Sequence, residues 1–256
     1  IYSQATTEDQ FLRVPLLPLS GFNGQYQNAG TVESNTLEFN ANAQLIRSND
    51  MSWDVRVTWQ SSEQEITKLD VPPYFSGPDG LYYIAEGESY GAIYGRSFVT
   101  SLAQLSNQLT AGESIDDYEV NSDGYVVEKG SQGTDSEQGI YVLDEFGSIA
   151  NTKIGDGRPD WTAGISNTFR YKNLSVYALV DIKHGGDVYN RKSQWLTRDS
   201  RNGIMDMTGV PESEKKTFDY YQSFYDVNSN NAYWVEDGGF VKLREVAITY
   251  NLTSDQ

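Results

Sequence analysis

The sequence contains no cysteine and only one histidine, His184. Without thiols, neither a disulfide framework nor a thiolate metal site can form. A lone histidine makes a poor metal centre, and a Ser-His-Asp triad would have to use this one residue. We therefore predict no catalytic residue and no metal ligand, and we interpret His184 as a structural residue at the end of a strand.

Basic residues and long apolar runs are also scarce. The chain carries 19 Lys and Arg against 36 Asp and Glu, a formal net charge of −17. A polyanion repels phosphate backbones, so we expect no nucleic-acid partner. No run approaches the ~18 apolar residues of a transmembrane helix. Residues 1–10 lack the basic and apolar segments of a signal peptide, and no Met precedes them, so we expect either processing or a start within a longer protein.

Tyrosine and glycine are abundant, with 18 and 23 residues, and this composition favours β-structure with long loops. Period-2 alternation of apolar and polar residues predicts antiparallel strands. The predicted strands are 31–46, 52–68, 160–171, 174–184 and 239–252. In the last of these the alternation slips at Arg244-Glu245, which predicts a β-bulge. Asn167 is the polar exception on the apolar side of its strand.

The apolar positions of these strands should share one outward face. The clearest of them are Leu37, Phe39, Val55, Val57, Val176 and Val180. Aromatic residues also fall near the strand ends: Trp53, Tyr171 and Tyr250 near short turns, and Trp161 near a long loop. Such a distribution is typical of the aromatic girdles of membrane barrels, although aromatic residues are also simply good strand formers.

Short and long connections alternate strictly along the chain. The links 47–51 and 172–173 are short, whereas 69–158 and 185–238 are long. In an antiparallel meander, all short turns then lie at one end of the sheet and all long loops at the other. Outer-membrane barrels have this arrangement as a rule. The predicted fold class is therefore all-β: a partial antiparallel transmembrane β-barrel of about six strands with long extracellular loops.

The long connections carry most of the acidity. Segment 69–158 holds 15 Asp and Glu against 4 Lys and Arg. A helix is predicted at about Glu212–Tyr225, after Pro211, from aromatic residues at helical spacing. Acidic stretches such as 121–124 and 144–147 suggest Ca²⁺ only weakly, because neither has the ligand pattern of an EF-hand. We expect no cofactor, with Ca²⁺ in an outer loop as a minor alternative.

Three stretches carry a resemblance to a known family. Residues 28–39 read NAGTVESNTLEF, residues 154–190 contain IGDGRPDWTAGISNTFRY and LSVYALVDIKHGGDVYN, and residues 236–252 read EDGGFVKLREVAITYNL. In this order and spacing they resemble conserved strands of the SusC/RagA-type TonB-dependent outer-membrane transporters. Thr36 stands where the family pattern has glycine. The resemblance covers almost the whole chain and is weakest in 96–150.

The resemblance implies a 22-stranded barrel with an N-terminal plug inside it. Residues 1–256 are then part of the one barrel domain, and we expect the plug domain to be absent from this chain. It also implies an outer-membrane location in a Gram-negative bacterium, with contact to membrane lipid. The family imports a nutrient, typically an oligosaccharide or a peptide. A SusD-like lipoprotein covers the outer mouth, and the TonB complex acts through the N-terminal plug.

Aromatic residues in the long loops are the candidates for substrate binding or for contact with the lipoprotein lid, because their faces stack on sugar rings. They are Tyr82, Tyr83, Tyr90, Tyr94, Trp195, Tyr220, Tyr221 and Trp234. The alternative for each of them is that it packs the loops against one another.

Two other functions fit the same composition. One is a soluble secreted β-sandwich that binds glycans, and the other is a β-rich glycoside hydrolase. The environment of the apolar strand faces discriminates these functions from that of a membrane barrel, because a sandwich buries its apolar face in a core whereas a barrel turns it outward. A barrel part should also depend on detergent for solubility.

Overall fold

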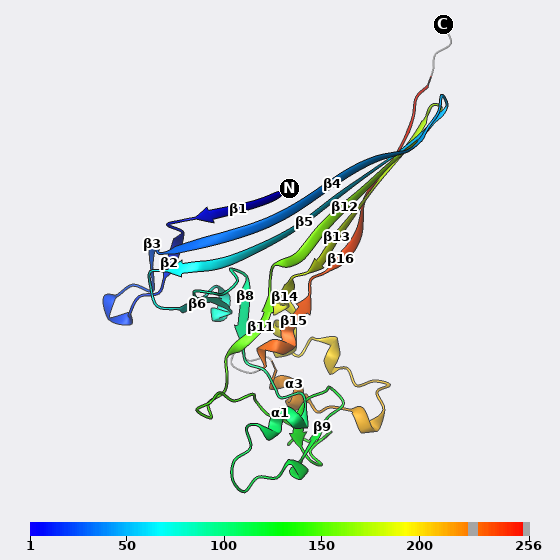
Figure 1. The fold of residues 1–256 in the computed structure, drawn as a ribbon. Coiled ribbons are helices and arrows are strands. Elements are labelled where there is room, and N and C mark those ends of the chain that lie inside the picture. Colours follow the sequence, from blue (N-terminus) through cyan, green and yellow to red (C-terminus); the bar gives the residue numbers. More distant parts are fainter. Residues whose placement is uncertain (225–229, 253–256) are drawn as a thin grey trace.

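The computed structural model describes residues 1–224 and 230–252. Its largest element is a six-stranded antiparallel sheet with the order β1-β4-β5-β12-β13-β16. Figure 1 shows these strands side by side as long, twisted ribbons. Their bounds are Tyr2–Thr7 (β1), Gly30–Arg47 (β4), Met51–Leu69 (β5), Pro159–Tyr171 (β12), Leu174–Gly185 (β13) and Phe240–Tyr250 (β16).

All five strands expected from the alternation are present, with ends within two residues of the prediction. The sixth strand, β1, pairs with β4 from Tyr2↔Leu37 to Thr7↔Val32. The all-β fold class is therefore confirmed.

The short turns lie together at one end of the sheet, at the upper right of Figure 1. Lys172 adopts φ 50° in the turn between β12 and β13. Its backbone N–H donates to the carbonyl of Asp50 in the turn between β4 and β5, at 2.7 Å. The long connections leave from the opposite end, as the alternation of link lengths predicts.

The predicted β-bulge in the last strand is confirmed. Leu179 pairs with Glu245, but the next residue of β13, Val180, pairs with Leu243. Arg244 is therefore the extra residue on β16. The bulge allows the apolar positions on both sides of the slip to keep the same face of the sheet.

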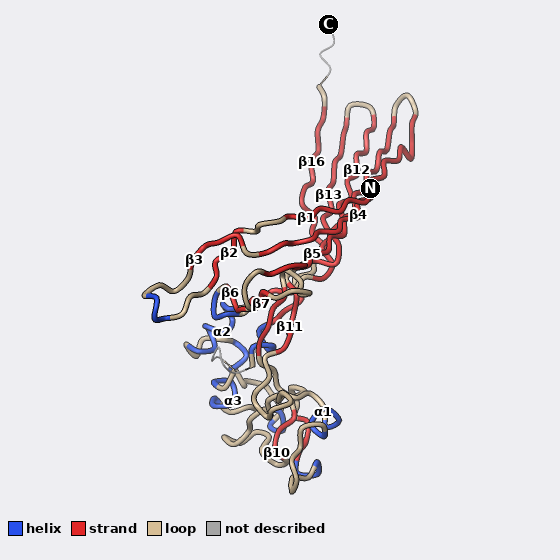
Figure 2. Tube along the Cα trace, turned by 60° about the vertical axis from the view of Figure 1, so that its left-hand side comes forward, coloured by secondary structure: helices blue, strands red, loops and turns tan. Residues whose placement is uncertain are grey.

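The smaller elements lie at the long-loop end, and Figure 2 shows how much of this end is loop. The small strands span Phe11–Val14 (β2), Gln25–Asn28 (β3), Tyr74–Ser76 (β6), Tyr82–Ile84 (β7), Ala92–Gly95 (β8), Tyr118–Val120 (β9), Val126–Glu128 (β10), Thr152–Asp156 (β11), Asp187–Tyr189 (β14) and Val235–Asp237 (β15). The α-helices span Leu102–Ser106 (α1), Arg191–Arg198 (α2) and Phe218–Gln222 (α3). None of the helices in the described part of the chain has the length and hydropathy of a membrane span.

The helix predicted at Glu212–Tyr225 is wrong in extent. The structure has a 3₁₀ turn at Glu212–Glu214 and α3 at Phe218–Gln222, and Tyr225 lies outside the described residues. Lys215 between them is extended, with ψ 140°. The break turns the side chain of Lys216 inward, where it pairs with a buried carboxylate.

The buried apolar cores lie at the long-loop end. One core, around Ile66 and Tyr74, joins the outer ends of β4 and β5 to the neighbouring hairpins. The other two lie within the long connections, around Trp234 and around Leu105. We call the described parts of residues 70–158 and 186–239 the loop assembly.

Candidate functional site

The six-stranded sheet has two chemically distinct faces. Residues paired across an antiparallel ladder point to the same side, so the register assigns each side chain to a face. The row through Phe39 continues in Trp59, Ala163, Ile182 and Val241. We call this side the apolar face; its other members include Leu37, Ala41, Val55, Val57, Ile165, Phe169, Val176, Val180, Leu243, Val246 and Ile248.

The apolar face does not contribute to any of the buried clusters found in the described residues. Phe39, Val241 and Ile248 are largely exposed. The six apolar positions expected to share one face do so, and they do not converge on a compact core. A β-sandwich would bury this face under a second sheet.

The polar exception on the apolar face has a partner. Asn167 pairs with Val55 and Ala178 in the ladder, and its Oδ1 accepts a hydrogen bond from the indole of Trp53 at 3.4 Å. The amide is thereby partly shielded by an aromatic ring near the short-turn end. Tyr171 and Tyr250 lie on the same face, two residue pairs closer to the turns than Trp53.

The opposite face is polar. Asp181 Oδ2 accepts a hydrogen bond from Arg244 Nε at 2.8 Å and forms an ion pair with Nη2 of the same guanidinium at 2.7 Å. The same guanidinium lies 5.4 Å from the ring centre of Phe240, and the ammonium of Lys242 lies 4.0 Å from the same ring centre. The bulge thus adds a cationic side chain to this face. A hollow of about 980 Å³ lies along it, with lining residues that include Glu38, Asn40, Thr58, Gln60, Asp181 and Arg244.

The loop assembly has an interior of its own. Its largest cluster contains five buried aromatic residues: Phe98, Tyr220, Tyr221, Phe224 and Trp234. Phe98 comes from the first long connection and the other four from the second. The ring centres of Phe98 and Phe224 lie 5.5 Å apart, and the indole of Trp234 donates to the carbonyl of Phe224 at 2.7 Å. The two connections therefore fold against each other as one body.

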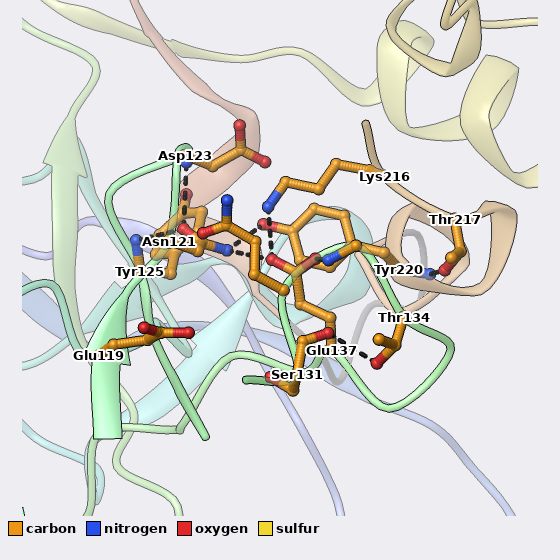
Figure 3. A network of polar contacts seen from close by, with 12 residues as sticks. Glu119, Asn121, Asp123, Tyr125, Ser131, Thr134, Glu137, Lys216, Thr217 and Tyr220 are labelled. Carbon is orange, nitrogen blue, oxygen red and sulfur yellow. Dashed lines mark hydrogen bonds and ion pairs between the residues drawn. The ribbon is translucent and has the colours of Figure 1, made fainter. Parts of the chain in front are cut away.

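A buried ion pair joins the same two connections (Figure 3). The ammonium of Lys216 contacts Oε1 of Glu137, and the two side chains are 1% and 0% exposed. Asn121 Nδ2 donates to Glu137 Oε1 at 2.8 Å, and the backbone N–H of Gly133 donates to Oε2 at 2.7 Å. A buried carboxylate is tolerated only when paired and hydrogen-bonded, and both oxygens of Glu137 meet this condition.

Tyr220 completes this network. Its hydroxyl accepts from Asn121 Nδ2 at 3.0 Å, and its ring lies 4.8 Å from the ammonium of Lys216. Burial, together with the nearby Asp123 carboxylate, raises the pKa of Tyr220 far above its usual value of 10.0. The four side chains of the network are buried and contact one another, so they fix the relative position of the two connections. Sequence reasoning did not find it, because Glu137 and Lys216 are far apart in the chain and neither stands in a recognisable motif.

The structure divides the eight aromatic candidates into two groups. Tyr220, Tyr221 and Trp234 are buried in the aromatic cluster, so their rings contact other rings of the loop assembly. The other five keep exposed surface: Tyr82, Tyr83, Tyr90, Tyr94 and Trp195. The exposed group contains the residues that could stack on a ligand or on a partner protein.

Four of the five exposed candidates lie on or beside the small sheet β11-β8-β7-β6. The ring centres of Tyr83 and Tyr94 are 4.7 Å apart, and Phe75 lies 4.9 Å from Tyr83. The hydroxyl of Tyr94 donates to Glu88 Oε1 at 2.6 Å. Burial and this hydrogen bond raise the pKa of Tyr94 to about 12, so it is neutral at physiological pH.

The fifth exposed candidate, Trp195, stands apart on α2. Guanidinium groups of Arg191 and Arg198 lie 5.0 and 5.5 Å from its ring centre, within cation–π range. The structure therefore presents two kinds of aromatic surface: tyrosines near carboxylates on the small sheet, and an indole among cations on α2.

His184 lies at the loop end of β13. Its ring stacks on Trp161 with centres 5.1 Å apart and an interplanar angle of 4°. Nδ1 lies 3.1 Å from Asp160 Oδ2, and both side chains are largely exposed to solvent. These contacts orient the ring and explain the position of His184 without a catalytic role.

The acidic loop stretches form turns. Asp144 Oδ1 accepts from the backbone N–H groups of Phe146 and Ser148 at 2.9 and 2.8 Å. In residues 1–224 and 230–252, no three His, Asp or Glu side chains cluster as metal ligands would. Ca²⁺ in an outer loop therefore stays a prediction without a located site.

Comparison with known proteins extends this description. No family model matches the chain. Over 98% of its length it is 26% identical to TonB-dependent receptor P3 of Formosa agariphila, and it spans 25% of that protein. TonB-dependent receptor P26 of the same organism is 24% identical over the whole chain, which covers 26% of it. TonB-dependent receptor SusC of Bacteroides thetaiotaomicron is 35% identical over 85 residues, which is 32% of this chain and 8% of SusC.

Solved structures show the same fold. The RagAB peptide importer in its closed-closed state matches 97% of this chain with a TM-score of 0.65 and 18% identity, and the match covers 26% of that structure's chain. A second structure, of the RagAB peptide transporter, matches 96% of this chain with a TM-score of 0.60, 19% identity and 26% coverage of its own chain. These findings define the fold of the chain as part of an antiparallel β-barrel. The resemblance to SusC/RagA-type TonB-dependent receptors is confirmed, and the chain spans about a quarter of the relatives that it matches over its whole length.

Proposed function

We propose that this chain is part of the β-barrel of a transporter in the outer membrane of a Gram-negative bacterium. The observation that carries the proposal is the uncovered apolar face of the six-stranded sheet, opposite a polar face. A barrel in a bilayer needs this distribution, with apolar side chains toward lipid and polar ones toward the lumen. Trp161 at the loop end and Trp53, Tyr171 and Tyr250 near the turn end then lie where aromatic girdles meet the lipid headgroups.

The proposal assigns the two ends of the sheet to the two sides of the membrane. The short turns face the periplasm and the loop assembly lies outside the cell. In the described residues, β1 pairs only with β4 and β16 only with β13. Unpaired strand edges cannot face lipid, so in the working protein further strands of the same barrel continue the sheet on both sides.

The transport activity is TonB-dependent import of a nutrient, an oligosaccharide or a peptide, together with a SusD-like lipoprotein over the loop assembly. Support comes from the relatives, which are named TonB-dependent receptors, and from the fold shared with the RagAB peptide importer. Energy coupling through TonB requires the plug, which is not among the segments described. The exposed aromatic candidates are the residues available for cargo or for the lipoprotein.

We expect no catalysis. His184, the one histidine of the sequence, is largely exposed and stacked on Trp161. A general acid or base needs a tuned pKa on a rigid frame, and the most buried carboxylate of the loop assembly, Glu137, is already paired. Turnover of glycans or peptides by the full-length protein, lost in His184→Ala, would overturn this expectation.

The transport proposal is tested with the full-length protein in its host. Cells carrying the intact gene should take up labelled oligosaccharide or peptide, and uptake should cease when TonB is removed. The protein should fractionate with the outer membrane and require detergent for extraction. Extraction as a water-soluble protein would favour a secreted glycan-binding β-sandwich instead.

A further inference from the structure

The helix α2 is held rigidly by its buried side. The Asn190 side chain caps it, accepting from the backbone N–H of Ser193 at 2.9 Å. Gln194 and Thr197 are fully buried. Asn202 Nδ2 donates to Thr197 Oγ1 at 2.8 Å, and the amide of Gln222, from α3, donates to the carbonyl of Thr197 at 3.1 Å. Packing of the helix is thus completed without Trp195, which is 49% exposed.

The exposed side of α2 is both aromatic and cationic. The indole of Trp195 has the guanidinium groups of Arg191 and Arg198 beside it, at 5.0 and 5.5 Å from its ring centre. Next to it is an open hollow of about 410 Å³, lined by Arg191, Lys192, Trp195, Leu196 and Asp199. This volume falls within the range of small-molecule sites, roughly 300–1,000 Å³. We call this surface the Trp195 site.

The charge of this surface is opposite to that of the chain. Residues 191–201 hold four Lys and Arg against one Asp, in a sequence with a net charge of −17. That acid, Asp199, accepts a hydrogen bond from Arg198 Nε at 2.9 Å, and Lys192 is a further cation that lines the hollow. Exposed charges act over about 8–10 Å at physiological ionic strength, so the local cations determine what approaches the Trp195 site. A local positive patch on an acidic loop assembly selects for an anionic ligand.

We propose that the Trp195 site binds an acidic sugar unit of an oligosaccharide, with the indole stacked on the sugar ring and the lining cations Arg191 and Lys192 on its carboxylate or sulfate. This inference deepens the transport function proposed above and rests on it. Pyranose rings present an apolar C–H face that packs on an aromatic ring. Arginine forms paired hydrogen bonds with planar carboxylates and with sulfate oxygens. The combination requires a ring and an anion in one ligand. A peptide of glutamate alone lacks the ring, and a neutral sugar lacks the anion.

The test uses the full-length receptor, purified in detergent, and direct binding measured by calorimetry. The probes are a tetramer of galacturonate, a neutral tetramer of galactose and a tetramer of glutamate. We expect the galacturonate tetramer to bind most tightly and to weaken with added salt. Trp195→Ala should reduce its affinity by about tenfold, the equivalent of one aromatic contact.

Two further variants separate charge from stacking. Lys192→Gln should weaken galacturonate binding by about tenfold and leave the binding of galactose unchanged, because it removes a cation that lines the hollow and keeps the indole. Lys215→Gln is the matched control, since Lys215 is an exposed cation of the same connection that pairs with Glu212 outside the site. Binding of all three probes to this variant should equal that of the unaltered receptor.

Several outcomes would overturn the inference. They are unchanged galacturonate binding in Trp195→Ala, tighter binding of the glutamate tetramer than of galacturonate, and loss of lipoprotein association without any change in sugar binding. The transport proposal fails separately. A receptor that inserts in the membrane and supports TonB-dependent uptake, but does not bind galacturonate, refutes the Trp195 site and leaves transport standing.

Discussion

In the six-stranded sheet the large apolar side chains lie on an uncovered face, whereas in the loop assembly they lie inside. Phe39, Val241 and Ile248 are exposed, and Trp234 and Phe224 are buried. The charged pairs follow the same division. The Asp181–Arg244 pair lies on an open face of the sheet, and the Glu137–Lys216 pair lies at the centre of the loop assembly.

In the membrane location proposed above, one chain satisfies two solvents. The sheet is ordered by backbone ladders, which need no water and leave the side chains free to match lipid on one side. The loop assembly is ordered like a water-soluble domain, by an aromatic core and a satisfied polar network. The two regions should consequently respond to different substitutions.

The largest expected effect is in the loop assembly. Lys216→Met leaves the carboxylate of Glu137 buried without its cation and should cost about 3–5 kcal/mol. Hydrogen exchange of the full-length receptor should show lost protection in the loop assembly and unchanged protection in the sheet. Lys215→Met, which removes an exposed cation next in sequence, should change stability by less than about 0.5 kcal/mol. Equal effects of the two variants would show that the buried pair is not what joins the connections.

The second effect tests the sheet with neighbouring residues on its two faces. Val180→Arg places a charge on the apolar face and should cost about 2–4 kcal/mol near the middle of a bilayer. Leu179→Arg places the same side chain on the polar face, opposite Glu245, and should be tolerated. Folding of the receptor into lipid vesicles, followed by heat-modified mobility in gels, distinguishes the two. Similar losses for both variants would break the assignment of the faces.

A smaller effect concerns the density of the aromatic cluster. A Cβ on Gly139 would overlap the ring of Phe98, whereas a Cβ on Gly203 would meet nothing within 4 Å. Gly139→Ala should therefore destabilise the loop assembly by about 1–3 kcal/mol, the usual cost of overpacking. Gly203→Ala should leave the unfolding midpoint of the loop assembly in urea unchanged. A loop assembly that accepts both changes is not packed like a domain core.

The smallest effect depends on pH. The raised pKa of Tyr220 means that above pH 10 the unfolded chain releases the phenolic proton while the folded chain keeps it. The folded state then binds more protons, so stability is complete below pH 10 and falls as pH rises, by about 1.4 kcal/mol per pH unit for this group. Tyr220→Phe should lessen that slope by this amount, as thermal unfolding between about pH 9 and 11 would show. An identical slope in both proteins would place the tyrosine in contact with water.

The sheet could be predicted from the sequence because its signal is local. Alternation along each strand fixes the face of every side chain, and the lengths of the links fix the arrangement of the ends. Even the slip at Arg244 is visible as a change of parity. The loop assembly could not be predicted in this way, since its order depends on contacts such as Glu137 with Lys216, between residues 79 apart. The predicted helix at Glu212–Tyr225 failed for this reason: a tertiary ion pair outweighed a local aromatic pattern.

The aromatic candidates show the same limit. Composition identifies the tyrosines and tryptophans of the long loops, but only packing decides which of them remain accessible. Tyr220 and Trp234 are interior residues, whereas Trp195 is exposed because Gln194 and Thr197 occupy the buried side of its helix. The sequence offers a weak signal for that helix in the capping residue Asn190, which the structure shows accepting from Ser193.

The bulge at Arg244 has a consequence for how this barrel can change over evolutionary time. Arg244 is the extra residue, so its deletion would bring Leu243 next to Glu245 and restore regular alternation, with Val241 and Leu243 still on the apolar face. Deleting Lys242 instead would move Val241 to the polar face. Among homologous sequences, the segment from the double glycine Gly238-Gly239 to Glu245 should therefore keep this length or lose only the bulge residue, whereas the neighbouring long connections can gain or lose whole segments.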